Sequence, residues 1–461
     1  MTGAAPTRPP AHLAAADSAA AAPAVVDPGA AEPYWYPLPS TGEAVRRVTE
    51  AFVARYGRSP DGVWAAPGRV NVIGEHVDYN AGLCLPFALP QRTYVALAAR
   101  PDDLIRVASL QSPHPPTPQP PTPHPSPRDQ GIPTDQGIRP ADGGWQGRLA
   151  DLAPGSVSGW AGYAAGVPWA LRLDGLDVPG FDAVFDGHVP LGSGLSSSAA
   201  LECAVAVALD DVAGLGLAAD DAGRARLAAA CVRAENEMAG APTGGLDQAS
   251  SLRCLTGAAL LLDCRDFSVA QVPFDLAGAG LELLVIDTRA HHALVDGRYG
   301  DRRQGCEQAC RELGVTSLRE VPATGLADAL ARLDGGADGP LAPLVRHVVT
   351  EIQRVQVTVD LLRAGRVREI GPLLDASHAS LREDYRVSCV ELDLACSVAD
   401  EAGALGARMV GGGFGGSAIA LVEAESVERV AAAVATAFAA ANLSAPAFLR
   451  AVPSAAATRV G

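Results

Sequence analysis

The chain has 461 residues, of which 48% are hydrophobic and 19% are charged, and this is enough to form two packed domains. Its formal net charge of −16 argues against nucleic acid and against an anionic membrane surface as partners. No apolar run approaches the roughly 20 residues that a membrane span requires. These properties fit a cytoplasmic enzyme.

All 36 basic residues of the chain are arginines, so the sequence contains no lysine. P-loop kinases and protein kinases need a lysine beside the phosphates, and Schiff-base enzymes need one as the nucleophile. The sequence therefore excludes these three classes. Any phosphoryl transfer by this chain must neutralise the phosphate charge with backbone dipoles, magnesium and arginine.

Residues 1–40 are rich in alanine and proline, and we expect them to form a disordered tail. They lack the basic start and the uninterrupted apolar core of a signal peptide. The nine cysteines are scattered and form no CxxC pair. Reduced, mostly buried thiols are therefore expected, in agreement with a cytoplasmic location.

A helix followed by strands is predicted between residues 41 and 110. The helix covers about 41–58, where apolar residues recur at helical spacing at Val45, Val48, Phe52 and Tyr56. Two strands are expected on either side of the segment 74–82, which contains turn-forming residues. The loop between them places Arg69, Glu75, His76 and Asp78 close together. Carboxylates and an imidazole can bond to hydroxyls, so the loop is a candidate site for a polyhydroxylated ligand, the alternative being a solvated charged loop.

Residues 112–140 are dense in proline and contain the small duplication RDQGI/TDQGI. Such a segment cannot bury a core and favours extended polyproline conformations. We expect a disordered insertion at a loop tip, with a ligand for an SH3-like domain as the alternative. A helix is expected to follow near residues 159–167.

A second motif, PLGSGLSSSAAL at residues 190–201, lies between a short strand at 183–186 and an apolar helix from 199 to 209. A loop of small residues that opens a helix presents free backbone N–H groups and the positive end of the helix dipole, which together bind phosphate. The alternative is a turn that only caps the helix. The candidate phosphate-binding residues are Gly192, Ser193, Gly194, Leu195, Ser196, Ser197 and Ser198.

A third motif, MVGGGFGGSAIAL at residues 409–421, has five glycines in six positions. Glycines weaken helices and strands, so this cluster indicates a loop pressed against a ligand or another loop. Gly412, Gly413 and Gly415 are expected to form a tight turn beside the first two motifs. Between the second and third motifs, strands and helices alternate, with a buried strand at 281–286.

In order and character these three blocks resemble the motifs of the GHMP kinase superfamily. The first block, GRVNVIGEHVDYN, is similar to the galactokinase signature GRVNLIGEHTDYN and departs from it mainly at Val72, Val77 and Ala81. The resemblance continues through residues 234–250 and 377–393, and it covers roughly 44–455 with one large gap. It implies an α+β, two-domain GHMP kinase fold, with an N-terminal domain like domain 2 of ribosomal protein S5 and a C-terminal ferredoxin-like domain. The expected boundaries are 41–265 and 266–461.

The resemblance also implies an activity. Galactokinases transfer the γ-phosphate of ATP to the C1 hydroxyl of α-D-galactose, giving galactose 1-phosphate for galactose catabolism by the Leloir pathway. The implied cofactors are ATP and Mg²⁺, and the implied partners are galactose and ATP alone, with the chain a monomer in the cytoplasm. A related kinase acting on an amino sugar, a uronic acid or arabinose is one alternative. A catalytically silent galactose and ATP sensor is another.

Matching positions assign roles to individual residues. Asp247 falls on the proposed base and Arg69 on its partner, while Ser198 and Glu235 fall on the magnesium ligands, whose hard oxygens suit that ion. Glu235 could instead be a surface carboxylate. The sugar-contacting positions of the family are occupied by Glu75, His76, Asp78, Gly244, Asp247 and Tyr299.

Two of the implied residues have a structural alternative. Trp160 matches a tryptophan that lies beside adenine, but it could be a core residue, and His76 could be a histidine that only holds the fold together. The chain departs from the family at Thr243, Gly245, Leu246 and Ser417. These changes are small or apolar and lie beside retained polar residues, so we expect them to affect substrate preference more than the reaction.

Overall fold

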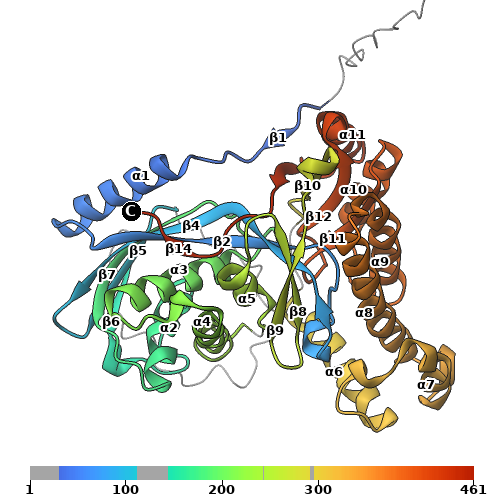
Figure 1. The fold of residues 1–461 in the computed structure, drawn as a ribbon, viewed down its shortest axis with the longest axis horizontal. Helices are drawn as coiled ribbons and strands as arrows, with labels where there is room; N and C mark the ends of the chain where they lie inside the picture. The colour runs from blue at the N-terminus through green and yellow to red at the C-terminus, as the bar shows by residue number, and fades with distance from the viewer. Residues whose placement is uncertain (1–30, 112–143, 242, 291–294) are drawn as a thin grey trace, which may run out of the picture. The chain divides into compact units, whose positions relative to one another are not determined.

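Three β-sheets and eleven α-helices make up the described part of the chain, which is residues 31–111, 144–241, 243–290 and 295–461 of a computed structural model (Figure 1). The strands are β1 (Tyr34–Trp35), β2 (Gly62–Asn71), β3 (Leu83–Cys84), β4 (Pro86–Arg100), β5 (Leu104–Ser109), β6 (Trp145–Arg148), β7 (Gly180–Gly187), β8 (Ala258–Asp263), β9 (Ser268–Pro273), β10 (Leu281–Asp287), β11 (Gly406–Val410), β12 (Ser417–Glu423), β13 (Ala447–Ala451) and β14 (Thr458–Arg459). The helices are α1 (Thr41–Tyr56), α2 (Ala161–Leu173), α3 (Ser197–Val212), α4 (Asp221–Arg233), α5 (Leu246–Arg253), α6 (Val295–Leu313), α7 (Leu326–Arg332), α8 (Ala342–Arg363), α9 (Gly371–Glu383), α10 (Val390–Glu401) and α11 (Val427–Ala440).

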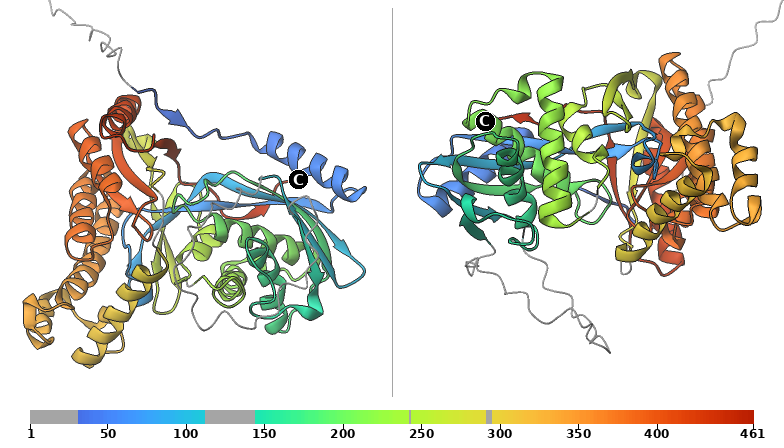
Figure 2. Two further views of the ribbon diagram at one scale, coloured as in Figure 1. Left: turned by 180° about the vertical axis from the view of Figure 1, so that it is seen from behind. Right: turned by 90° about the horizontal axis from the view of Figure 1, so that it is seen from below.

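The six-stranded sheet has the order β14-β2-β4-β7-β5-β6, and helices cover both of its faces. Helix α1 lies on one face, and α2, α3 and α4 lie on the other (Figures 1 and 2). Side chains alternate along a strand, so β2 contributes Val63 to the core under α1 and Trp64 to the core under the other helices. A strand buried on both sides must be apolar on both sides, which explains its nearly continuous apolar sequence.

The five-stranded sheet has the order β1-β13-β10-β12-β11 and is antiparallel except between β1 and β13. Helices from the last third of the chain pack on it, and α11 buries Val430, Val434 and Phe438 at a spacing of four residues. A third sheet, β3-β8-β9, starts directly after the loop of residues 74–82. These layers of helices and sheets form the α+β architecture expected from the sequence.

Each end of the described chain adds a short strand to one of the two larger sheets. Near its start, β1 pairs with β13, and at its end β14 pairs with β2. The expected tail over 1–40 is therefore too long, because Tyr34 and Trp35 form a strand and Trp35 packs on Phe448. Two-residue strands carry no periodic signal, so they could not be predicted from the sequence. The remainder of that expected tail, and the proline-rich insertion at 112–140, lie outside the described residues.

Most predicted elements are confirmed at their expected places. The helix expected over 41–58 is α1, which begins after Ser40 because this residue and Glu43 form a capping box. The helix expected at 199–209 is α3, and the buried strand expected at 281–286 is β10. Within the described residues, no helix is both long enough and apolar enough to cross a membrane.

Candidate active site

A cavity of about 210 Å³ lies where three segments meet: the loop after β2, the start of α5 and the glycine-rich third motif. We call residues 74–82 the sugar loop, residues 192–198 the phosphate loop and residues 411–416 the glycine loop. The cavity collects most of the side chains that the sequence assigned to the sugar and the reaction. Its lining residues are Arg69, Gly74, Glu75, His76, Asp78, Glu235, Thr243, Gly244, Leu246, Asp247, Tyr299, Gly411 and Gly412.

Arg69 and Asp247 form a close ion pair at the floor of this cavity. The Nε atom of Arg69 donates to Oδ1 of Asp247 at 2.8 Å, and its Nη2 lies 2.7 Å from the same oxygen. A register shift between Pro67 and Arg69 interrupts the β2–β4 ladder, and such bulges turn a side chain out of its regular direction. The Nη1 atom donates to the carbonyl of Gly194 at 2.6 Å, so one guanidinium joins Asp247 to the phosphate loop.

Glu75 connects the sugar loop to the glycine loop. Its Oε1 atom accepts a hydrogen bond from Gly411 N–H at 2.9 Å and lies 3.5 Å from Nη2 of the fully buried Arg408. Arg408 also donates to the carbonyls of Asn71 and Val72 at the end of β2. One carboxylate oxygen of Glu75 therefore holds the two loops together while the residue still lines the cavity.

Both ring nitrogens of His76 have protein partners. Nε2 lies 3.2 Å from the carbonyl of Gly412, which can only accept, so Nε2 carries the proton and Nδ1 accepts from the hydroxyl of Tyr79 at 2.9 Å. The chain of hydrogen bonds continues from Tyr79 to Tyr385 and on to Cys306. Burial, followed by the charge of His347, lowers the pKa of His76 to about 3, so the ring stays neutral. These partners favour a structural role for His76.

Asp78 and Gly244 fit against each other at the mouth of the cavity. A Cβ atom on Gly244 would lie only 2.1 Å from Oδ2 of Asp78, so this position has room for no side chain unless Asp78 moves. Burial, followed by the neighbouring charges of Asp247 and Glu75, raises the pKa of Asp78 to about 6. Tyr299 closes another side of the cavity, with its ring centre 5.5 Å from that of His76.

The phosphate loop runs into the first turn of α3, as the motif predicted. Ser193 is held inside the loop, because its hydroxyl donates to the carbonyl of Pro190 and its own carbonyl accepts from Ser417 Oγ at 2.7 Å. A Cβ atom on Gly411 would lie 3.4 Å from the carbonyl oxygen of Gly194, so the glycine loop packs on the phosphate loop as expected. Ser197 and Ser198 begin α3, where unpaired backbone N–H groups and the helix dipole favour phosphate.

The donors expected for magnesium also lie together. Glu235 sits in the π-helical turn Ala234–Ala239 after α4, and Ser198 is within hydrogen-bonding reach of its carboxylate. Burial, followed by the charge of Asp247, raises the pKa of Glu235 to about 7, and a bound cation would offset that penalty. A hydroxyl and a carboxylate oxygen suit Mg²⁺, which takes its other ligands from phosphates and water. The residues present therefore fit the ion.

Two further buried side chains surround Glu235. The Nε2 atom of Gln248 donates to Oε2 of Glu235 and, at 3.0 Å, to Oε2 of Glu202. Glu202 and Gln248 are fully buried, and each keeps one oxygen, Oε1, without a partner. The sequence did not single out these residues, because a glutamate inside an apolar helix gives no sign of which neighbour it meets.

Trp160 lies apart from this cavity. It immediately precedes α2 and packs edge-on against Phe185 of β7, with 5.8 Å between ring centres. It is only partly buried in the core between β7 and the helices. Its core contact agrees with the structural alternative, while its exposed part leaves the adenine role a proposal.

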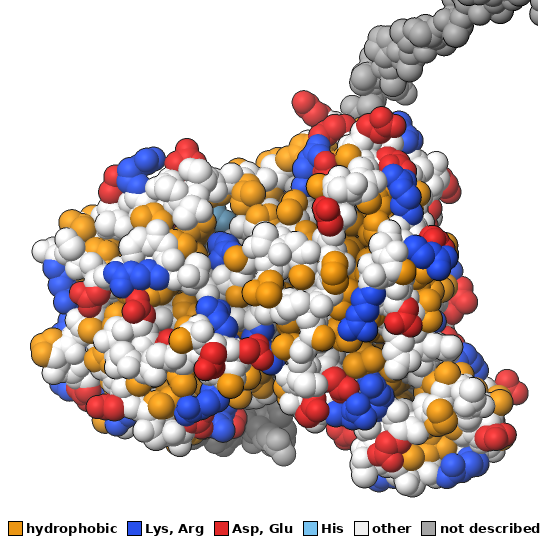
Figure 3. Space-filling model, in the orientation of Figure 1, with side chains coloured by type: hydrophobic (Ala, Val, Ile, Leu, Met, Phe, Trp, Pro, Cys, Tyr) orange, Lys and Arg blue, Asp and Glu red, His pale blue; other side chains and the backbone are white. Residues whose placement is uncertain are grey.

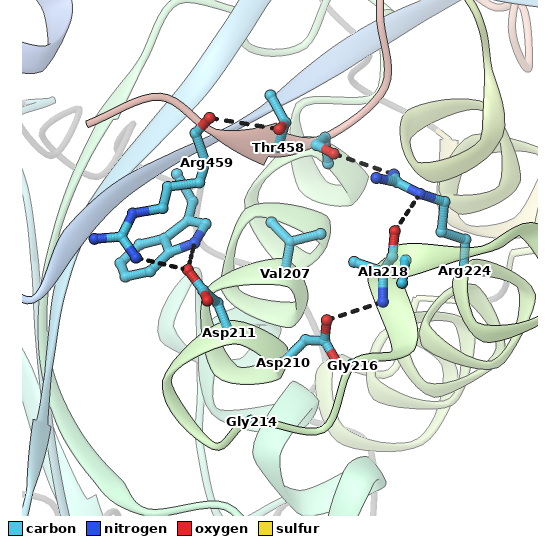
Figure 4. Close-up of a pocket in the computed structure, with 12 residues that line it drawn as sticks. Val207, Asp210, Asp211, Gly214, Gly216, Ala218, Arg224, Thr458 and Arg459 are labelled. Atoms are coloured by element: carbon cyan, nitrogen blue, oxygen red, sulfur yellow. Dashed lines mark hydrogen bonds and ion pairs between the residues drawn. The ribbon is translucent and has the colours of Figure 1, made fainter.

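A larger hollow of about 490 Å³ lies where the C-terminal segment crosses the six-stranded sheet (Figure 4). Its charged groups already have partners within the protein. Arg459 bonds to Asp211, and Arg224 donates to the carbonyls of Ala218 and Ala457. No candidate base or phosphate-binding loop lines it, so the smaller cavity is the better candidate for the active site.

Comparison with known proteins identifies the family. A family model of the galactokinase galactose-binding signature matches residues 50–99, and models of the N-terminal and C-terminal domains of GHMP kinases match 163–254 and 358–440. The galactokinase of Streptomyces coelicolor is 49% identical over 420 residues, which are 91% of this chain and 100% of that protein. The chain belongs to the galactokinase family.

More distant relatives agree with this assignment. The galactokinase of Bos taurus is 39% identical over 85% of this chain and 91% of its own length. The crystal structure of Lactococcus lactis galactokinase complexed with galactose matches with a TM-score of 0.77 at 29% identity, covering 89% of this chain and 98% of that one. A mevalonate kinase of Methanococcus jannaschii, at 13% identity and a TM-score of 0.53, shares the fold.

Membership of this family establishes the activity of the chain. The enzyme is an ATP-dependent sugar kinase that transfers the γ-phosphate of ATP to the C1 hydroxyl of galactose, with Mg²⁺ as the metal. Its substrates are small molecules. The absence of lysine agrees with phosphate binding through a loop of small residues and a helix N-terminus.

Proposed function

We propose that the Arg69–Asp247 pair carries the chemistry of the transfer to α-D-galactose. The observation that supports this is position: the pair lies between the sugar cavity and the phosphate loop, and Arg69 bonds to both Asp247 and Gly194. Asp247 accepts the proton of the C1 hydroxyl as the hydroxyl oxygen attacks the γ-phosphorus of ATP, and the bond from that phosphorus to the bridging oxygen breaks to release ADP. Arg69 orients the carboxylate and offers positive charge to the transferred group.

The sugar occupies the cavity beside this pair. Asp78, Glu75 and Tyr299 present oxygens to its hydroxyls, and Gly244 leaves the space that a side chain would fill. His76 also lines the cavity, and its main role is to fix the sugar loop against Gly412. Directional bonds to several hydroxyls distinguish galactose from other sugars.

ATP binds along the phosphate loop. Backbone N–H groups of residues 192–198 and the N-terminus of α3 hold its phosphates, and Trp160 lies beside the adenine. Ser198 and Glu235 hold Mg²⁺, which supplies positive charge to the phosphate oxygens when it is bound. The nearby Gln248 and Glu202 fix the carboxylate of Glu235.

The enzyme works as a cytoplasmic monomer with domains of residues 41–265 and 266–461, and it has no nucleic-acid or membrane partner. The net charge of −16 and the intermixed acidic and basic side chains on the face in Figure 3 support this proposal. All nine cysteines are free, which suits a reducing compartment. The six-stranded sheet takes β2, β4, β5, β6 and β7 from the first range, and the five-stranded sheet takes β10 to β13 from the second, which supports two domains. The boundary itself falls in the turn between the paired strands β8 and β9.

Two substitutions separate the sugar site from the nucleotide site. Asp78→Ala leaves bound hydroxyls unpaired, so we expect the KM for galactose to rise at least about tenfold while the KM for ATP changes by less than about twofold. Ser198→Ala should instead raise the requirement for magnesium and ATP. Steady-state kinetics with each substrate varied in turn measures both. Equal effects of both variants on both substrates would contradict the assignment of separate sites.

A further inference from the structure

Ser196 has an unusual backbone conformation within the phosphate loop. Its φ angle is +61°, in the left-handed region that costs a non-glycine residue about 1–2 kcal/mol. Gly192 and Gly194 adopt positive φ in the same loop without that penalty. A serine at such a position indicates that its side chain does something a glycine could not.

The side chain of Ser196 contacts Asp247 directly. Its Oγ atom donates to Oδ2 of Asp247 at 2.5 Å, and an ionised carboxylate can only accept. The other oxygen, Oδ1, accepts a hydrogen bond from Arg69, which also donates to the carbonyl of Gly194. Both oxygens of Asp247 are therefore fixed by groups that belong to the phosphate loop or bond to it.

We propose that Ser196 is a positioning residue for Asp247 and that its hydroxyl does not bind phosphate. With its hydroxyl committed to Oδ2, Ser196 keeps the carboxylate plane directed at the acceptor hydroxyl. The carboxylate of Asp247 then keeps a constant position relative to the loop that holds ATP, so the galactose hydroxyl and the γ-phosphate are aligned with each other. This inference rests on the proposed role of Asp247 as the base.

The positive φ of Ser196 makes a clean test available. Ser196→Gly removes the hydroxyl but retains a residue that favours this backbone conformation, so the variant should fold with an unchanged melting temperature. We expect kcat to fall about 10- to 100-fold, the range for a lost hydrogen bond to a charged group, with both KM values and the equilibrium affinity for a non-hydrolysable magnesium–ATP analogue within about twofold. Asn442→Gly is the matched control, because Asn442 is an exposed non-glycine residue with a φ of +55° after α11. It should leave kcat unchanged.

A double variant tests whether Ser196 acts through Asp247. In an Asp247→Asn background, Ser196→Gly should reduce the single-turnover rate by less than about threefold, because the effects of coupled residues do not add. Ser196→Ala should match the single Ser196→Gly variant in kcat. A near-normal kcat in Ser196→Gly, or a loss of analogue affinity as large as the loss of kcat, would overturn the inference while leaving the base assignment intact. Substantial activity in Asp247→Asn alone would instead overturn the proposed base.

Discussion

Because Asp78 is a proposed sugar ligand, we expect its carboxyl group to make galactose binding depend on pH. Its pKa of about 6 lies above the ordinary value of 3.8, so the folded protein binds this proton more tightly than the unfolded chain does. Lowering the pH through 6 therefore relieves the penalty for burying the charge, but it removes the acceptor that the sugar hydroxyls need. At pH 5 about a tenth of the group stays ionised, so we expect the KM for galactose to rise about tenfold between pH 7.5 and pH 5.

Asp78→Asn is the control for this pH effect, since the amide does not titrate. Its KM for galactose should be high at pH 7.5 and should not rise further toward pH 5. Steady-state kinetics at saturating ATP measures both proteins. A wild-type rise that persists unchanged in Asp78→Asn would show that another group is responsible.

Gly244 has no side chain, and this leaves room for the carboxylate of Asp78. Gly244→Ala would place a Cβ atom 2.1 Å from Oδ2 of Asp78, so this carboxylate must turn away. We expect the KM for galactose to rise about tenfold or more with little change in the KM for ATP, since one hydrogen bond to a charged group is lost. Gly42→Ala in α1 is the control, because a Cβ atom there has nothing within 4 Å. If Gly244→Ala binds galactose normally, Asp78 is not a sugar ligand.

At the residue scale, the sequence motifs predicted which side chains would meet but not what each would bond to. Arg69, Asp78 and Asp247 come together around one cavity, as the family resemblance implied. The bond from His76 to Gly412 and the bond from Ser196 to Asp247 join residues more than 50 positions apart, so neither leaves a local pattern in the sequence. Such contacts between distant residues are set by the tertiary structure and can be identified only from it.

The C-terminal strand β14 anchors the edge of the six-stranded sheet. Arg459 bonds to Asp211 and to the carbonyl of Asp61, and its guanidinium lies 5.2 Å from the ring centre of Trp64. Arg459→Ala should therefore lower the free energy of unfolding by about 1–2 kcal/mol, the sum of a cation–π contact, a hydrogen bond and an exposed ion pair. Urea denaturation followed by circular dichroism measures this change.

Arg366→Ala is the matched control for Arg459→Ala. Arg366 also pairs with one carboxylate, Glu369, but both side chains are more than half exposed at 56% and 52%. Such a pair contributes little, so the free energy of unfolding should change much less than it does in Arg459→Ala. Equal effects of the two substitutions would show that β14 adds nothing to stability.

Elements with strong periodicity were predictable, and short or irregular ones were not. The apolar spacing of α1 and the buried run of β10 predicted both elements to within about two residues. The π-helical turn that carries Glu235 has no distinctive composition. Strands β1 and β14 depend on partners at the opposite end of the chain, so sequence proximity could not reveal them.

For the whole molecule, the proline-rich segment should be dispensable. It connects β5 and β6, which pair antiparallel from Leu104 opposite Arg148 to Val107 opposite Trp145. Adjacent strands lie about 5 Å apart, so a short linker can join them. Replacing residues 113–139 with a Gly/Ser linker should leave kcat and the melting temperature nearly unchanged, because loop length affects closure entropy by only about 0.6 kcal/mol per doubling. A variant with normal stability but weakened ATP binding would assign the segment to the nucleotide site.

The most direct test of this account combines product analysis with one substitution. Purified protein, ATP, magnesium and galactose should yield a phosphate resonance coupled to the anomeric proton of an α-linked galactose 1-phosphate in a ³¹P NMR spectrum. Asp247→Asn keeps the shape of the side chain but removes its charge, so it should retain less than a tenth of the wild-type rate, a loss of at least about 1.4 kcal/mol, while binding galactose within about tenfold. Phosphate on another hydroxyl, or an Asp247→Asn variant that keeps more than a tenth of the rate, would contradict the account.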